Sequence, residues 1–314
     1  MTKLFDIVAL GEAMVEFNQT GAVGGRTYLQ GFGGDTSNAL IAARRQGARG
    51  AYITRVGDDE FGAMLLELWR SEGVDTQGVA VDAASPTGIY FVHHGAQGHR
   101  FSYRRAGSAA SLMTPSGLPE SLLRSTAFLH VSGISQAISA GAAATVHAAI
   151  QIAHAAGAQV AYDPNLRLKL WPLERAREVI LQTMPLCDQF LPSLDDVQLL
   201  SGLNEPHEIV AWCHAQGART VVLKLGREGS LVSSGGPYVA VAAHAVNSVD
   251  ATGAGDCFDG SYLHRLALGD EPVAAARWAS AAAALATTGY GAVAPLPRAE
   301  QIKLLLAPGS LAAG

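Results

Sequence analysis

One short segment of the chain combines a glycine turn with acidic side chains. Residues 250–256 read DATGAGD, and the spacing of apolar residues predicts a helix directly after it, over 257–268. The glycines leave backbone N–H groups at the helix start open to an anion, and the helix N-terminus adds the positive end of its dipole. Asp256 lies beside this anion site as a candidate general base. These features suit phosphoryl transfer, in which N–H groups stabilise developing charge and a carboxylate deprotonates the acceptor hydroxyl.

The same segment has a purely structural alternative, a glycine turn in which an aspartate caps a helix. No GK[ST] follows the turn, so it is not a P-loop, and it does not match GxGxxG. A bare GxGD would favour the structural alternative, whereas the full string is more specific. The predicted catalytic residues are Gly253, Ala254, Gly255 and Asp256. The helix dipole further predicts that the Asp256 carboxylate is ionised at neutral pH.

Short apolar strands alternate with amphipathic helices along most of the chain. The predicted strands are 6–10, 51–56, 127–131, 159–163 and 220–224. The predicted helices are 35–46, 59–72, 141–156, 172–183, 254–268 and 273–288. This alternation is typical of βαβ units and predicts an α/β fold with a central, mostly parallel sheet flanked by helices.

Two segments, 15–30 and 88–105, break this alternation. Their short alternating runs predict antiparallel strands outside the main sheet. Such an insertion often forms a lid over an active site, and an ordinary sheet edge is the structural alternative. We therefore expect one domain over 1–314 that carries a small β-sheet lid which closes on the substrate. The exposed lid sheet also predicts a homo-oligomer, most simply a dimer.

The composition of the 314 residues excludes several classes of protein. Hydrophobic residues make up 49%, and 22 basic against 27 acidic residues give a net charge of −5, so no nucleic-acid partner is expected. The three cysteines lack metal-ligand or disulfide-framework spacing, which indicates a reduced, cytoplasmic location. An uncharged stretch at 125–162 is interrupted by glycines and histidines, so no membrane span is expected.

Three motifs, in order along the chain, resemble those of the ribokinase-like, PfkB-type sugar kinases. Residues 250–256 resemble the DTxGAGD string of that family, with Ala251 inside it. Residues 33–39 (GGDTSNA) supply its glycine pair followed by an asparagine, and 55–62 (RVGDDEFG) fit its VGxDxxG segment. The resemblance runs from about Ile7 to Pro295. It implies a ribokinase-like fold, ATP as phosphoryl donor and Mg²⁺ as the accompanying metal.

Finer features resemble one branch of this family, the 2-keto-3-deoxygluconate kinases. The similar segments are 33–36 (GGDT), 103–111 (YRRAGSAAS, with Arg104 for a second tyrosine), 163–171 (DPNLRLKLW) and 191–196 (LPSLDD). The branch implies phosphorylation of a keto sugar acid at its 6-hydroxyl, with the sugar acid and ATP as the small-molecule partners. The alternative is a neutral-sugar kinase of fructokinase or ribokinase type. A non-catalytic sugar sensor is the third possibility, but it would have no need of Asp256.

A sugar acid carries a carboxylate, and the guanidinium fork of arginine matches a carboxylate with two parallel hydrogen bonds. Arg105 and Arg167 are the candidates for this contact, although Arg167 could instead contact the phosphates of ATP. The substrate-binding residues implied by the resemblance and this argument are Gly34, Asn38, Tyr90, Tyr103, Arg105, Arg167 and Asp256.

Residues 221–229 are expected to form a strand that enters a glycine turn, and the resemblance implies that ATP lies along this turn. The implied ATP-binding residues are Asn165, Ser193, Lys224, Gly226, Gly229, Gly253 and Gly255. The NxxE motif of the family is SLDD here, at 193–196. Asp196 is therefore the candidate on the metal side, acting through water.

Overall fold

The computed structural model describes residues 3–20, 25–95 and 98–307. In this part of the chain nine strands form one large sheet. Their spatial order is β13 (Val239–Val241), β12 (Ser230–Ser233), β11 (Thr220–Lys224), β10 (Gln189–Phe190), β9 (Gln159–Asp163), β8 (Thr126–Ser132), β1 (Phe5–Leu10), β4 (Gly50–Gly57) and β5 (Val79–Asp82). The seven neighbours from β11 to β5 run parallel, and β12 and β13 are added antiparallel at one edge.

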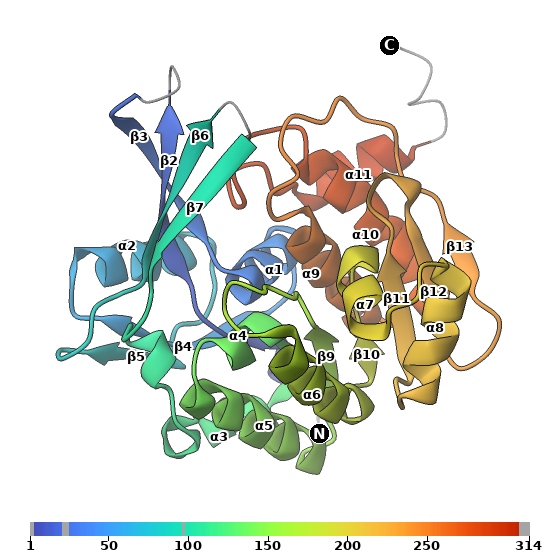
Figure 1. Cartoon of the computed structure of the whole chain (residues 1–314), viewed down its shortest axis with the longest axis horizontal. Coiled ribbons are helices and arrows are strands. Elements are labelled where there is room, and N and C mark those ends of the chain that lie inside the picture. Colours follow the sequence, from blue (N-terminus) through green and yellow to red (C-terminus); the bar gives the residue numbers. More distant parts are fainter. Residues whose placement is uncertain (1–2, 21–24, 96–97, 308–314) are drawn as a thin grey trace.

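Helices cover both faces of this sheet, as Figure 1 shows. Strand β1 is buried on both sides, so Val8 and Leu10 belong to one apolar core and Ile7 and Ala9 to the other. The first face carries α3 (Glu120–Arg124), α4 (Gly133–Ala137), α5 (Ala140–Ala155), α6 (Leu173–Thr183), α7 (Leu194–Ser201) and α8 (Pro206–Ala215). The second carries α1 (Asp35–Arg45), α2 (Glu60–Ser71), α9 (Ala254–Ala267), α10 (Pro272–Ala286) and α11 (Ala299–Leu306). Short 3₁₀ helices cover Ala110–Leu112, Pro115–Gly117, Met184–Leu186 and Gly226–Glu228.

The predicted elements of this layer are confirmed. Strands β9 and β11 have the predicted bounds, and the ends of the other predicted strands and helices agree to within two residues. The ribokinase-like α/β architecture is therefore present. None of the described helices has the length and apolar character to cross a bilayer.

The lid is a separate four-stranded sheet in the order β3 (Thr27–Gly33), β2 (Met14–Thr20), β6 (Ile89–Gly95) and β7 (Gly98–Arg104). In Figure 1 it stands beyond one end of the large sheet. The β2–β3 and β6–β7 pairs are antiparallel as predicted, but the central β2–β6 pair is parallel. The reason is topological: β2 follows β1 and β6 follows β5, and these two strands leave the large sheet in the same direction. Residues 21–24 and 96–97 of the predicted lid segments lie outside the described residues.

The strand order locates the ligand site. Strands β4 and β5 are added on one side of β1 and strands β8 to β11 on the other, so the order reverses at β1. In open α/β sheets ligands bind at such a reversal, outside the carboxyl ends of the strands. Here these ends lie below the lid sheet, next to the start of α9.

Candidate active site

The turn before α9 is open, as the glycine pattern predicts. Gly253 has φ 76° and precedes the helix, and no described side chain caps the helix start. Asp250 holds the turn in place: its carboxylate accepts hydrogen bonds from the backbone N–H of Thr252 at 2.9 Å and of Gly291 at 3.0 Å. A Cβ on Gly253 would lie only 3.0 Å from Ala292, so this close approach also requires glycine. The Ala254 N–H donates to the backbone oxygen of Ala251 at 3.2 Å, and the helix dipole together with the other N–H groups of the first turn suits this turn to an anion.

Asp256 lies in the first turn of α9, beside this anion site. Its Oδ2 accepts a hydrogen bond of 2.9 Å from the side-chain amide of Asn38 on α1. Burial, followed by the nearby carboxylate of Asp35, raises the pKa of Asp256 to about 7. The prediction of a fully ionised carboxylate was therefore wrong, because burial and like charges outweigh the helix dipole. A carboxyl that titrates near neutral pH suits a general base.

Asn38 reaches Asp256 because α1 begins very close to the end of β1. Gly34 precedes the helix with φ 136°, a conformation that side chains rarely adopt. A Cβ at this position would lie 2.6 Å from the backbone oxygen of Glu12. The backbone oxygen of Gly34 then accepts from the N–H of Asn38 at 2.8 Å, which closes the first turn of α1.

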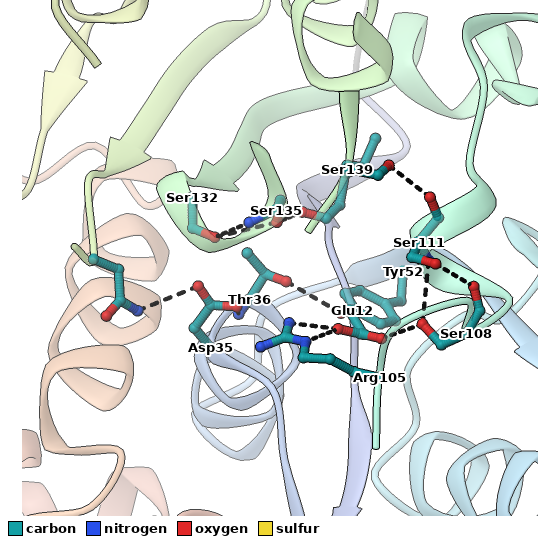
Figure 2. A network of polar contacts seen from close by, with 12 residues as sticks. Glu12, Asp35, Thr36, Tyr52, Arg105, Ser108, Ser111, Ser132, Ser135 and Ser139 are labelled. Carbon is teal, nitrogen blue, oxygen red and sulfur yellow. Dashed lines mark hydrogen bonds and ion pairs between the residues drawn. The ribbon is translucent and has the colours of Figure 1, made fainter. Parts of the chain in front are cut away.

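Glu12 is the centre of a buried polar network beside the cavity (Figure 2). Its side chain is fully buried, and Arg105 on the strand end of the lid forms an ion pair with it, with Nε donating at 2.7 Å. Ser108 donates its hydroxyl to the same carboxylate at 2.6 Å. Arg105 thus reaches the cavity, but its charge is already neutralised by Glu12.

Two tyrosines of the lid face the cavity from neighbouring strands. The rings of Tyr90 and Tyr103 stack with their centroids 5.7 Å apart. The Tyr90 hydroxyl donates to the buried carboxylate of Glu16 at 2.5 Å, so the ring faces the cavity while its polar end is engaged elsewhere. These rings form an apolar part of the cavity wall.

Arg167 follows β9 and lies exposed on the cavity wall. Its Nη1 donates to the backbone oxygen of Leu166 at 2.9 Å. Within the described part of the chain, Arg167 takes part in no ion pair, in contrast to Arg105. Its guanidinium is therefore available to an anionic ligand.

Lys224, at the end of β11, is held in a buried cluster of charges. Its Nζ donates to Asp163 at 2.9 Å and to both oxygens of Asp259 at 2.9 and 3.1 Å. Burial alone would raise the pKa of Asp163, but the Lys224 ammonium keeps this pKa below its usual value. Burial raises the pKa of Asp259. Because these carboxylates occupy the three N–H donors of the ammonium, Lys224 joins β9, β11 and α9.

Of the residues expected to bind ATP, all but one line the cavity. Gly226 and Ser193 line the cavity, and the Ser193 hydroxyl caps α7 by accepting from Asp196 N–H at 3.3 Å. Gly229 does not line the cavity: it closes the turn after β11 against the β13 end, where a Cβ would lie 2.8 Å from the backbone nitrogen of Ala243.

Asp196 fits a metal held by one protein carboxylate. Burial and the Asp163 carboxylate raise the pKa of Asp196 to about 6. No group of three or more His, Cys, Asp or Glu side chains in the described residues could cage a metal. Mg²⁺ is usually held by one or two carboxylates together with water and substrate phosphates, which agrees with this arrangement.

All these parts meet at one cavity of about 870 Å³ below the lid. The predicted site residues on its wall are Gly34, Asn38, Tyr90, Tyr103, Arg105, Asn165, Arg167, Ser193, Asp196, Lys224, Gly226, Gly253, Ala254, Gly255 and Asp256. Glu12, Asp35 and Asp163 also line it, although the sequence did not single them out. Asp35 and Asp163 stood inside the motifs quoted above, which was the available signal. Glu12 follows a strand without any motif.

A glycine turn at a helix start beside a buried carboxyl group suits the transfer of a phosphoryl group to an alcohol. The fold and the site thus define the class of protein as a phosphotransferase that acts on a hydroxyl group.

Comparison with known proteins shows which kind of phosphotransferase this chain resembles. Residues 4–299 match the pfkB family of carbohydrate kinases. The chain is 37% identical to 2-dehydro-3-deoxygluconokinase of Thermoproteus tenax, with 96% of this chain and 94% of that protein covered. It is 34% identical to fructokinase-1 of Zea mays, with 96% and 97% covered. A structure described as a ribokinase II of Escherichia coli, in complex with ATP and Mg²⁺, superposes with a TM-score of 0.88 at 26% identity, covering 98% of this chain and 99% of the other.

The chain belongs to the pfkB family of carbohydrate kinases. It is a sugar kinase, and its phosphoryl donor is ATP together with a divalent metal. The relatives include both a sugar-acid kinase and neutral-sugar kinases, so the family alone leaves the acceptor open.

Proposed function

We propose that the chain phosphorylates 2-keto-3-deoxygluconate (2-dehydro-3-deoxy-D-gluconate) at its 6-hydroxyl, as a 2-dehydro-3-deoxygluconokinase of sugar-acid catabolism. One observation carries this proposal: the cavity wall presents the exposed guanidinium of Arg167 with no ion-pair partner among the described residues. A neutral sugar would give no reason for such a group, whereas a carboxylate matches it with two hydrogen bonds. The name of the Thermoproteus tenax relative supports the same substrate.

In this mechanism Asp256 faces the terminal hydroxyl of the sugar acid and accepts its proton as the oxygen attacks the terminal phosphorus of ATP. The bond from that phosphorus to the bridging oxygen breaks, and ADP leaves. The N–H groups of the Gly253–Gly255 turn stabilise the negative charge on the transferred group. Asn38 holds the Asp256 carboxylate in place through its 2.9 Å hydrogen bond. Arg167 binds the carboxylate at the other end of the sugar acid, and Tyr90 and Tyr103 enclose its carbon chain.

The nucleotide lies along the other half of the cavity in this proposal. Asn165, Ser193, Lys224 and Gly226 form this wall, and Lys224 acts there as a buried, paired charge. Asp196 is the metal-side carboxylate. A bound Mg²⁺ would neutralise charge on the phosphates of ATP.

A neutral-sugar kinase of fructokinase type is the second candidate, and one observation favours it. Arg105 is neutralised by Glu12, so only one of the two predicted carboxylate-binding arginines has an unpaired charge. A hexose would need only hydrogen bonds at that end of the cavity. The fructokinase of Zea mays agrees with this alternative.

An ATP-coupled assay over keto sugar acids and neutral hexoses tests the proposal. We expect the keto acid to be the best substrate, and Arg167→Ala to lower kcat/KM for it by about 10- to 100-fold, since a charged hydrogen bond contributes about 1.5–3 kcal/mol. Arg104→Ala is the control, because Arg104 is an exposed arginine of the lid that does not line the cavity. A preference for a hexose, or a loss of ATP affinity with normal sugar-acid binding in Arg167→Ala, would contradict the assignment.

We further infer that the kinase is one domain over 1–314, with lid segments at about 15–30 and 88–105, and that it acts in the cytoplasm as a homo-oligomer. The free, buried thiols of Cys187, Cys213 and Cys257 agree with a reducing compartment. Strand β3 is an edge of the lid sheet, and Leu29 on it is 64% exposed, which supports self-association there. Sedimentation should give a dimer, and a monomer at micromolar concentration would contradict the prediction.

A further inference from the structure

Arg45 is a mostly buried arginine that has no part in the proposed mechanism. It is the last residue of α1, its side chain is 13% exposed, and it does not line the cavity of about 870 Å³. Its Nε and Nη2 donate to the two carboxylate oxygens of Glu72 at 3.0 and 2.6 Å. Its Nη1 donates to the backbone oxygens of Val293, Ala294 and Leu296 at 3.0, 3.3 and 2.7 Å. Every nitrogen of the guanidinium group is therefore engaged.

The three backbone oxygens belong to the segment after α10, residues 287–298, which we call the α10 loop. It connects α10 to α11 without forming a helix or strand. Val293 and Leu296 are buried, so their carbonyl groups need donors that no helix or strand supplies. A guanidinium group offers five N–H donors in one plane, which lets a single side chain satisfy several carbonyl groups. Arg45 thus fixes the path of the α10 loop.

The α10 loop in turn supports the glycine turn before α9. The backbone oxygen of Thr287 accepts from the N–H of Asp250 at 3.1 Å, and the Gly291 N–H donates to the Asp250 carboxylate at 3.0 Å. Ala292 lies so close to Gly253 that a Cβ on this glycine would be 3.0 Å from it. Because the turn and the loop are joined at these three points, a displaced loop would displace the N–H groups that the proposed mechanism assigns to the phosphoryl group.

Helix α1 carries Arg45 on the same face as Asn38. The two residues are seven positions apart, which is almost two turns of a helix and about 10 Å along its axis. Asn38 donates to the carboxylate of the candidate general base at 2.9 Å. The end of α1 is fixed by Gln46, whose amide donates to Ser261 on α9 at 2.6 Å and accepts from Trp278 on α10 at 2.8 Å. One anchored helix therefore holds the general base through Asn38 and the α10 loop through Arg45.

We propose that Arg45 is a positioning residue for phosphoryl transfer, which holds the α10 loop and thereby sets the place of the Gly253–Gly255 turn relative to Asp256. The inference rests on the proposed transfer at this turn and is independent of which sugar is the acceptor. The residues proposed to enclose the sugar, Tyr90 and Tyr103, lie on the lid strands β6 and β7. Loss of Arg45 should therefore lower kcat and leave the KM for the sugar nearly unchanged.

The experiment compares Arg45→Met with Glu72→Gln in the ATP-coupled assay. Glu72→Gln removes the same ion pair but leaves Arg45 able to donate to the three carbonyl groups of the α10 loop. Arg45→Met should lower kcat by about 10- to 100-fold, the range for a misplaced reacting group, with a nearly unchanged KM for the sugar. Glu72→Gln should keep the wild-type kcat.

Urea unfolding of the same two variants separates positioning from stability. Both lose the pair between Arg45 and Glu72, so both should unfold at a lower urea concentration than the wild type. Arg49→Met, which removes the exposed pair of Arg49 with Asp6, is the control for the loss of an arginine and should change neither kcat nor KM. The proposal is overturned if folded Arg45→Met keeps the wild-type kcat, or if Glu72→Gln loses as much kcat as Arg45→Met.

Arg45→Lys keeps the test decisive if Arg45→Met does not fold. Lysine retains the positive charge beside Glu72, but its ammonium has three N–H donors, too few to replace the five hydrogen bonds of the guanidinium group. We expect a folded protein with a lowered kcat, and a wild-type kcat would overturn the proposal. An active Asp256→Asn protein would refute the proposed transfer itself, whereas an inactive Asp256→Asn beside a normal Arg45→Lys would refute only the role of Arg45.

Discussion

The base of this kinase, meaning the large sheet and the helices on its two faces, and the lid sheet hold their site residues in different ways. The base presents Asp256, Lys224 and Asp163 from the ends of strands and helices whose apolar sides lie in two large cores. The lid sheet has one small core of Met14, Tyr90 and Val92. The charged side chains of the site thus come from the part of the molecule that is most firmly packed. The apolar wall of the sugar site comes from the part with the fewest buried contacts, which is where local opening is easiest.

The largest effect should follow a change at the base of the site, in Asp256→Asn. This substitution keeps the shape of the side chain but removes the general base, so kcat should fall by about 10²–10⁴-fold. Binding of ATP and sugar should change little, which isothermal titration can measure beside the kinetics. An aspartate that only capped the helix would be replaced well by asparagine. Near-normal turnover in a folded variant would therefore refute the catalytic role.

The second-largest effect should be a loss in the free energy of unfolding when Lys224, in the base, is replaced. Lys224→Met leaves Asp163 and Asp259 buried without their cation, and breaking a buried pair in this way destabilises by about 3–5 kcal/mol. Urea unfolding measures the loss. Glu72→Gln, which removes a partner of the Arg45 ion pair away from the cavity lined by Lys224, is a control for the loss of an ordinary pair. Adding Asp259→Leu to Lys224→Met should recover part of the stability, and no recovery would show that the charges are not the cause.

The charges of the base also predict a pH dependence. The pKa of Asp256 is raised to about 7, so its ionised form, which acts as the general base, appears only as the pH rises. We therefore expect kcat to increase about tenfold between pH 6 and 8. The folded pKa lies above the ordinary value, so this carboxyl stabilises the fold at low pH and loses that contribution as the pH rises towards 7. Asp256→Asn should therefore raise Tm more at pH 8 than at pH 5. A kcat that is flat from pH 6 to 8 would mean that the Asp256 carboxylate is already ionised at pH 6.

The same comparison explains what could be predicted from the sequence. The buried strands of the base, such as β9 and β11, produce apolar runs between turns, so their bounds followed from local pattern. The pairing of β2 with β6 depends on where two distant strands leave the large sheet, which no local pattern contains. The lid was recognisable only as a break in the alternation.

For the site, motifs identified the residues but not their partners. The glycine turn and Asp256 are local in sequence, and the structure brings them together as predicted. The pKa of Asp256 is raised first by burial and then by the carboxylate of Asp35, more than 200 residues away, and the local dipole argument contains neither cause. Arg105 likewise looked available until Glu12, a single acidic residue outside any motif, was found to pair with it.

The smallest effect, and the one that most directly tests the mobility of the lid, should appear in amide hydrogen exchange. Strands β2 and β6 should gain protection when the sugar and an ATP analogue bind, because closing the lid over the cavity removes water from Tyr90 and Tyr103. The strands of the base, β9 and β11, already lie between two helical layers, so their protection should stay the same and serve as the internal control. Since the expected change is confined to one sheet, global stability need not alter. Equal protection of β2 and β6 with and without ligands would mean that the small sheet is a fixed wall, and selection of the substrate would then depend on the side chains of a rigid cavity.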